Sequence, residues 1–258
     1  MWIRFQRFSE ETPLKDPLLL VCLSTSDPQF RLLYSQGREL GRLLLRKLGF
    51  KQISLLYSSA LPPEVKVGED GVASLVSNSF YLYSGPTRDY VLLTGHSTPV
   101  EDQFEYSDAV LSYAEKLGVK ELVSFGPRWT ETTSPPLEAP KITGFASDDE
   151  GAKRLTDAGI TVLRNESAFY FGNLIVPVSK FHGIRAFKIS SDHGEPSPNP
   201  RTMLAYLSVL SRMFGLKVDE AGLEEQTQQL EEAIKRAEIG GEGPEEDSKN
   251  TQNEDIYR

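Results

Sequence analysis

The chain has 258 residues and a formal net charge of −9, so it is long enough for one large α/β domain or two small ones. The acidic balance argues against nucleic acid as a partner, and no apolar run approaches the ~18 residues of a membrane span. The single cysteine, Cys22, excludes an intrachain disulfide and lies in an apolar run, which predicts a buried, reduced thiol. Because the N-terminus also lacks an apolar signal segment, we expect a cytoplasmic protein.

The first half of the chain alternates apolar runs with helical patterns. Residues 18–23 form a continuous apolar run, which predicts a strand covered on both faces. A helical pattern follows, starting near Asp27-Pro28 and stopping at Gly49. Two further strands are predicted at 53–57 and 90–95, with a hairpin-like stretch between them.

The same alternation continues beyond residue 100. Residues 106–117 fit one helix face, Gly118 supplies its end, and a strand at 119–125 follows at once. Ser147 with Glu150 three residues later is predicted to form a capping box. That box opens a short helix ending at Gly159, with a strand at 160–163 after it.

The last third of the body is read as strand followed by two helices. Residues 174–181 fit either a helix or a strand, whereas 184–189 fit a strand. Asn199-Pro200 is predicted to cap a helix that ends at Gly215. Asp219 is predicted to cap a final helix that runs to about Glu238.

The final helix has a thin apolar stripe. A stripe of this width suits docking along a neighbouring element or subunit better than a wide core-facing surface. Its members are Leu223, Leu230, Ile234 and Ala237.

The C-terminal segment differs in composition from everything before it. Residues 240–255 contain six acidic residues, one lysine and no aliphatic or aromatic residue beyond glycine and proline. Such a segment cannot bury enough apolar surface to offset its ordering entropy, so we expect a flexible tether. It ends in Ile256-Tyr257-Arg258, which places a hydrophobic pair next to a free carboxylate.

Five segments, in order, resemble the proteasome assembly chaperone family, and specifically the archaeal homologues of its second subunit. This resemblance implies a three-layer α/β/α fold around a mixed, mainly parallel sheet and a homo-oligomeric state. It also implies a role in proteasome assembly or activation rather than catalysis. The segments are residues 44–65, 91–99, 106–126, 142–163 and 194–219. We therefore expect one domain over residues 1–239, closed by a C-terminal helix, and a disordered acidic tail over 240–258.

Two departures from the family pattern concern its glycine-rich turns. Ser24-Thr25-Ser26-Asp27 stands where the first such turn is usual, and only Gly172-Asn173 stands at the second. Backbone amides can cradle an anion only where the chain approaches it closely, which glycine permits. The losses therefore argue against a phosphate pocket.

The tail resembles the HbYX motif (hydrophobic, tyrosine, any residue) of proteasome activators. In that case Ile256 fills a hydrophobic slot and Tyr257 packs its ring. The terminal carboxylate of Arg258 forms an ion pair, and its side chain is free to vary. The predicted function is docking into pockets between subunits of the proteasome core's outer ring. A rival hypothesis is a scaffold whose body, rather than its tail, binds free ring subunits.

The alternative is a small-molecule enzyme or ligand-binding protein with its site at the strand carboxyl ends. His96 follows one predicted strand and Asp192-His193-Gly194 another, where open α/β sheets place ligands. However, the chain has no nucleophile elbow, P-loop, dinucleotide fingerprint or metal-ligand spacing. His182 is read as a turn residue. We therefore predict no catalytic residue, metal or cofactor.

Overall fold

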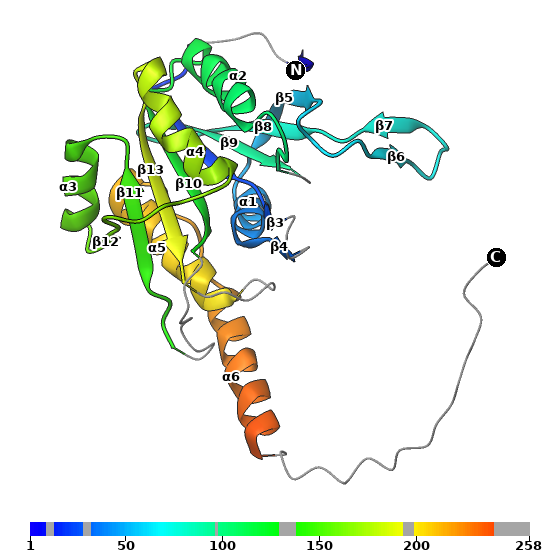
Figure 1. Cartoon of the computed structure of the whole chain (residues 1–258). Helices are drawn as coiled ribbons and strands as arrows, with labels where there is room; N and C mark the ends of the chain where they lie inside the picture. The colour runs from blue at the N-terminus through cyan, green and yellow to red at the C-terminus, as the bar shows by residue number, and fades with distance from the viewer. Residues whose placement is uncertain (9–12, 28–31, 96–97, 129–137, 193–198, 240–258) are drawn as a thin grey trace.

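The computed structural model describes residues 1–8, 13–27, 32–95, 98–128, 138–192 and 199–239. Within these residues, nine strands form one sheet, flanked by helices (Figure 1). In spatial order the strands are β1 (Ile3–Arg7), β5 (Lys51–Ser58), β8 (Asn78–Ser84), β9 (Asp89–Gly95), β2 (Leu18–Cys22), β10 (Glu121–Pro127), β13 (Arg185–Ser191), β11 (Ile142–Ala146) and β12 (Thr161–Val162). The helices are α1 (Gln36–Lys47), α2 (Gln103–Lys116), α3 (Asp149–Asp157), α4 (Phe171–Val178), the 3-10 helix η1 (Ser179–His182), α5 (Pro200–Phe214) and α6 (Leu223–Ile239).

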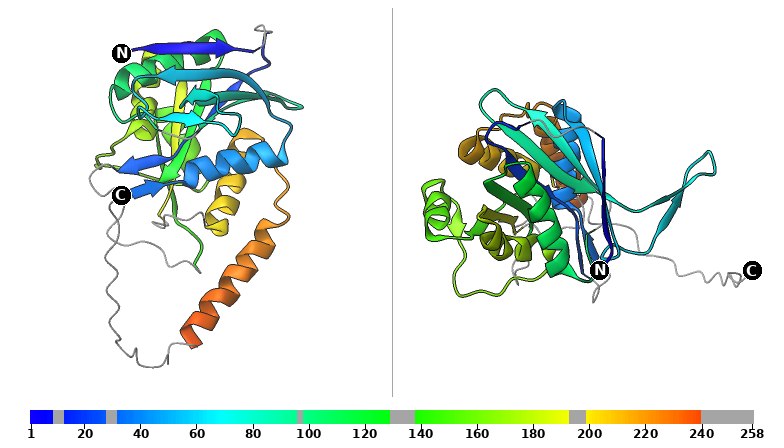
Figure 2. Two further views of the ribbon diagram at one scale, coloured as in Figure 1. Left: turned by 90° about the vertical axis from the view of Figure 1, so that its right-hand side faces the viewer. Right: turned by 90° about the horizontal axis from the view of Figure 1, so that it is seen from above.

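The sheet is mixed, with a parallel centre. Strands β9, β2, β10 and β13 run parallel to one another. Antiparallel strands flank them, with β8, β5 and β1 on one side and β11 on the other. In the view from above in Figure 2, helices lie on both sides of the sheet. The predicted three-layer α/β/α fold is confirmed.

Alternation along the strands divides the core into two halves. Leu19 and Val21 of β2 face the half that contains Val110 of α2 and Ile175 of α4. The other half is built from the alternate residues of the same strands and from α1, α3 and α5. All five residues of β2 are buried, as its unbroken apolar run predicts.

Two glycines of α1 allow this helix to lie unusually close to the sheet. A Cβ atom at Gly37 would lie 2.5 Å from the carbonyl oxygen of Leu23 and 2.7 Å from that of Phe125. A Cβ atom at Gly41, one turn on, would lie 2.6 Å from Oγ1 of Thr94. Any larger residue at these two positions would therefore force α1 away from the sheet.

The predicted start of the first helix is wrong. Residues Thr25–Asp27 form β3 and Leu32–Tyr34 form β4, which pair antiparallel, and α1 begins only at Gln36. A short apolar segment such as Leu32–Tyr34 fits a strand and a helical face equally well, so periodicity alone could not separate the two.

The capping box predicted at Ser147 does not form. The N-cap of α3 is Asp148, whose Oδ1 accepts a hydrogen bond from the Gly151 amide at 2.6 Å. The Ser147 hydroxyl instead accepts a hydrogen bond from the Ala186 amide of β13. Glu150 bonds Arg185 rather than its own helix. Pairing with the neighbouring strand therefore shifts the helix start by one residue.

The C-terminal helices follow the prediction more closely. Asn199 caps α5 by accepting from the Arg201 amide, and the helix ends at Gly215 with φ of +73°. The ambiguous segment 174–181 is helical, forming most of α4 and η1. Asp219 accepts from the Ala221 amide but lies in the turn before α6, so it is not the N-cap.

Between β5 and β8 the chain forms the hairpin β6 (Val65–Val67) and β7 (Ala73–Leu75), as the sequence indicates. The hairpin projects away from the sheet in Figure 1. Both of its strands are exposed along their whole length, so its stability comes from its own pairing rather than from the core.

One buried hydroxyl joins four elements. The side-chain oxygen of Tyr206 in α5 accepts a hydrogen bond from the Ser191 amide of β13 at 3.1 Å. It donates to the carbonyl oxygen of Gly126 in β10 at 2.7 Å, and Gln36 of α1 lies 3.0 Å away. Burial raises the pKa of this phenol, so it stays protonated and continues to donate.

Replacing Tyr206 with phenylalanine should lower the free energy of unfolding by about 1–3 kcal/mol, because buried polar groups lose their partner. The measurement is urea unfolding monitored by circular dichroism. Tyr57→Phe is the matched control, since that hydroxyl bonds Gln6 on the surface at 3.2 Å. Its loss should cost less than about 0.5 kcal/mol. Equal effects of the two substitutions would contradict the role given to Tyr206.

Candidate functional site

The last helix, α6, extends away from the folded body and ends at Ile239. In Figure 1 and in the left view of Figure 2, α6 runs outward from the end of α5. Its first residue, Leu223, is buried and belongs to the core cluster beneath α5. Of the two alternatives for the apolar stripe, a neighbouring element or a subunit, Leu223 fits the first, because it packs on its own domain.

Polar contacts fix the start and the middle of α6. Nζ of Lys47 in α1 donates to Oδ2 of Asp219 at 3.1 Å and to the carbonyl oxygen of Ala221 at 2.9 Å. Eight residues into the helix, Glu231 forms an ion pair with Arg201 in the first turn of α5. The direction of α6 is therefore set by contacts from two other helices.

Beyond Glu231 the described contacts of α6 are its own. Arg236 pairs with Glu232 one turn earlier, and both side chains are largely exposed. The helix thus extends past its last described attachment to the body before it ends at Ile239. The predicted docking residues Ile256, Tyr257 and Arg258 lie outside the described residues, so their role stays a prediction.

Two of the three histidines, His96 and His193, also lie outside the described residues. The third, His182 in η1, is more than a turn residue. Its Nε2 lies 3.0 Å from Oδ1 of Asp108, and its Nδ1 lies 3.3 Å from Oε2 of Glu115. The ring therefore links η1 to two positions of α2 that are seven residues, or about two turns, apart.

The described part of the chain contains no cluster of three or more His, Cys, Asp or Glu side chains that could hold a metal ion. Of the helices that the structure describes, none has the length and apolar character to cross a membrane.

A charged residue that the sequence analysis passed over lies in the core. Lys188 of β13 is only 2% exposed, and within the described residues its amine has no hydrogen bond or ion pair. Burial lowers the pKa of Lys188 to about 7. The segment RAFKISS offered a signal, because strand alternation places Lys188 on the same face as the buried Ala186.

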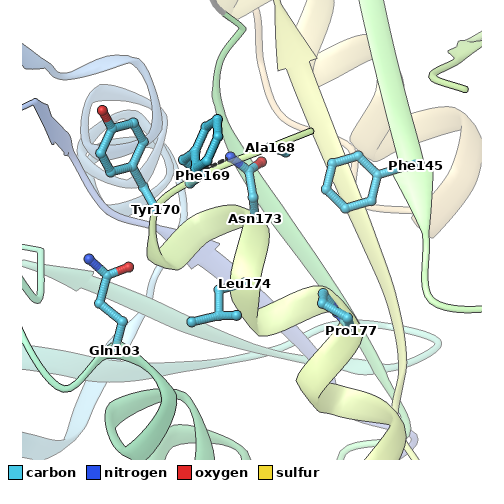
Figure 3. A pocket seen from close by; sticks show the side chains of 8 residues that line it. All are labelled: Gln103, Phe145, Ala168, Phe169, Tyr170, Asn173, Leu174 and Pro177. Atoms are coloured by element: carbon cyan, nitrogen blue, oxygen red, sulfur yellow. Dashed lines mark hydrogen bonds between the residues drawn. The ribbon is translucent and has the colours of Figure 1, made fainter. Parts of the chain in front are cut away.

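An open pocket lies at the start of α4 (Figure 3). Its volume is about 360 Å³, and it lies between α4 and β11. In Figure 3, Tyr170 and Asn173 mark the helix start, and Phe145 faces them from the neighbouring strand. Phe145 of this lining is directly opposite Lys188 in the β11–β13 register.

Comparison with known proteins settles the family. Residues 37–238 match the model of the PAC2 family. The chain belongs to the PAC2 family. This match confirms the resemblance to proteasome assembly chaperones that the five segments carry, because solved structures with the same fold include homologues of those chaperones. Among curated proteins, none matches the chain.

Three solved structures illustrate how widely this PAC2 fold is shared. PbaB of Pyrococcus furiosus, an archaeal proteasome activator, aligns with a TM-score of 0.75 at 18% identity, covering 92% of this chain and 98% of that one. PbaA of the same organism, an archaeal homolog of proteasome-assembly chaperone, gives 0.70 at 16% identity, covering 93% of each chain. A proteasome-assembly chaperone homologue of Mycobacterium tuberculosis aligns with a TM-score of 0.68 at 19% identity, covering 85% of this chain and 94% of that one. At these identities the likeness establishes a common fold.

The lowered pKa of Lys188 makes stability depend on pH. Between pH 7 and its usual pKa of 10.5, the unfolded chain binds a proton that the native protein does not. Stability should therefore rise with pH in this window, by up to about 1.4 kcal/mol per pH unit. Burial raises the pKa of the Cys22 thiol, so that group stays neutral there.

Urea unfolding of the natural protein and of Lys188→Met at pH 7 and pH 9 tests this. Methionine removes the amine, so the difference in unfolding free energy between the two proteins should shift in favour of the natural protein as pH rises. Lys153→Met, at an exposed position of α3, is the control and should give a constant difference. A constant difference for Lys188→Met as well would show that its amine titrates normally.

Proposed function

We propose that this protein is a cytoplasmic, proteasome-binding assembly chaperone or activator. It docks C-terminal tails ending in Ile256-Tyr257-Arg258 into pockets between subunits of the proteasome core's outer ring. The observation that carries the proposal is α6, which extends away from the body of a PAC2 fold and ends at Ile239, just before the C-terminal segment begins. The fold shared with PbaB and PbaA supports the same partner.

The energetics of such a tail require more than one copy. Burying Ile256 and the Tyr257 ring contributes about 2 kcal/mol each, and an ion-paired carboxylate adds about 1.5–3 kcal/mol. Ordering and association offset much of this gain. A single tail should therefore bind only at about the micromolar to millimolar level. Useful occupancy follows when several tails of one homo-oligomer engage one ring.

The length of the tether suits this arrangement. Residues 240–255 add 16 residues between the end of α6 and the docking tripeptide. A chain of that length reaches ~55 Å when extended and ~20–24 Å on average. Since contacts with α1 and α5 fix the direction of α6, the tails of an oligomer would start from defined points.

The proposal assigns no catalytic residue, metal or cofactor to the chain. A rival function is a scaffold whose body binds free ring subunits without the tail. No described contact favours that rival, but it predicts a different response to truncation, because removing the tripeptide would leave its binding intact.

The direct test compares the full chain with a chain ending at Asp255, using an archaeal proteasome core particle. Binding and peptide hydrolysis are both measured. We expect truncation to abolish binding, because the hydrophobic pair and the carboxylate are removed together. Loss of binding with loss of stimulated hydrolysis identifies an activator, and loss of binding without any stimulation by the full chain identifies an assembly factor.

Point variants separate the roles of the three residues. Tyr257→Ala should weaken binding at least tenfold, whereas Arg258→Ala should change it less than twofold, because only the main-chain carboxylate of that residue is used. A C-terminal tag should abolish binding by displacing the carboxylate. Retained binding by the truncated or tagged chain would refute tail docking and favour the scaffold.

A further inference from the structure

The start of α4 lies over two buried polar side chains of the central sheet. Ser124 of β10 and Lys188 of β13 are direct neighbours in the parallel register and are 1% and 2% exposed. Gly172, the second residue of α4, lies directly above both. A Cβ atom built at Gly172 would be 3.2 Å from Oγ of Ser124 and 3.6 Å from Nζ of Lys188. The two polar atoms therefore converge on one point.

These side chains lack the partners that buried polar atoms normally have. Among the described residues, Oγ of Ser124 makes no hydrogen bond, and neither does Oγ1 of Thr143, which is 4% exposed. Thr143 lies opposite Ser190 in the β11–β13 register, on the sheet face that carries Lys188. Buried hydroxyls without a partner, close to a buried amine, are costly, and a ligand that accepts hydrogen bonds would remove that cost.

Backbone donors add to the same place. The amides of Phe171 and Gly172 open α4 and have no acceptor within the described residues, as expected for a first helical turn. Tyr170 precedes them with φ of +73° and ψ of 159°, a conformation that only glycine adopts without strain. Tyr170 is thus a strained residue, and its backbone conformation directs the start of α4 toward Lys188.

We propose that this cluster is a binding site for a small oxyanion, the phosphate or carboxylate group of a metabolite. We name it the Lys188 cradle, formed by Ser124, Thr143, Lys188 and the amides of Phe171 and Gly172. An ammonium, two hydroxyls and helix N-terminal amides are all hydrogen-bond donors, which is the set that an anionic acceptor needs. An anion in this position would supply the charge partner that Lys188 lacks.

The pocket of Figure 3 gives the remainder of the ligand a place. Tyr170 and Asn173 of its lining flank Gly172 in sequence, and Phe145 lies opposite Lys188 across the strand pair. The lining is largely apolar and aromatic, with the Asn173 amide held by the Phe169 carbonyl oxygen. The site therefore suits an acid with an apolar or aromatic body.

The cradle alters the conclusion drawn from the sequence about anion binding. The sequence has only Gly172-Asn173 where a glycine-rich turn is usual, and this loss argued against a phosphate pocket because glycine permits close backbone approach. In the structure this single glycine brings the start of α4 close to Ser124 and Lys188.

Gly172→Ala gives a test that keeps every charge in place. The added methyl fills the cradle, while alanine favours the helix over glycine, so the variant should fold at least as well as the natural protein. Gly49→Ala is the matched control, because a Cβ atom there meets nothing within 4 Å. Lys188→Met provides a second variant that removes the ammonium and fills its space with an apolar chain.

The full chain and these variants are titrated with inorganic phosphate and with benzoate, followed by the Gly172 amide resonance in NMR spectra. For the variant that lacks this glycine, neighbouring amides of α4 serve instead. We expect saturable binding of at least one anion by the natural protein and the Gly49→Ala control, weakened at least tenfold by Gly172→Ala and by Lys188→Met. Phosphate binding alone would identify a phosphate ligand, and preference for benzoate an aromatic carboxylate.

Two results would overturn the proposal. One is the absence of saturable binding of either anion by the natural protein. The other is binding by Gly172→Ala and Lys188→Met with the affinity of the control, which would place the anion elsewhere. Neither result depends on the C-terminal tail, so the cradle and the proposed proteasome docking are tested independently.

Discussion

Burial of β2 on both faces is the constraint from which the rest of the architecture follows. A strand whose five residues are all apolar and all buried needs parallel neighbours on either side and helices above and below. Helices α2 and α4 cover one face, and α1 and α5 cover the other. Since each face must close around the same strands, the helices cannot shift independently of one another. The Tyr206 hydroxyl, which touches β10 and β13 from α5, shows how closely the layers are joined.

The burial of β2 on both faces can be predicted from its unbroken apolar run, which is why the fold class could be predicted. Long apolar runs and helix ends at glycine identify β2, β9, α2 and α5, because these features depend on residues close together in the chain. Predictions that depended on distant partners were less successful. The choice between Ser147 and Asp148 as N-cap was decided by the Ala186 amide of β13, which is far from α3 in sequence. The strand β4 was read as part of a helix because three apolar residues carry no period.

The two functional regions differ in the same way. The C-terminal tripeptide is a linear signal, so it can be proposed from sequence alone, and the contribution of the structure is the outward course of α6. The Lys188 cradle is assembled from β10, β11, β13 and α4, and each contributes an ordinary residue. Only the register of the strands and the approach of Gly172 bring them together. Alternation in the segment RAFKISS could have identified Lys188 as inward-facing. It could not have identified Ser124 or Gly172 as the residues that lie next to it in space.

A domain with both features would combine a partner-binding end and a ligand-binding centre. The helix α4 that opens the cradle packs directly on α2, so a ligand there would contact the core rather than a peripheral loop. By contrast, α6 is attached through Leu223, Lys47 and Arg201 on the opposite side of the sheet. The sheet itself separates the two regions.

The close approach of α1 to the sheet has a consequence for how this family can diverge. At Gly37 the obstacles to a side chain are the main-chain oxygens of Leu23, just after β2, and of Phe125 in β10, which no change of neighbouring side chains can remove. At Gly41 the obstacles are side-chain atoms, Oγ1 of Thr94 at 2.6 Å and the Cβ atoms of Thr94 and Cys22 at 3.0 and 3.1 Å, so a smaller residue at position 94 would relieve the closest contact. Relatives that keep this helix in place should therefore be invariant at the first position and should covary at the second. The pair gives a structural marker for aligning chains whose overall identity has fallen below one residue in five.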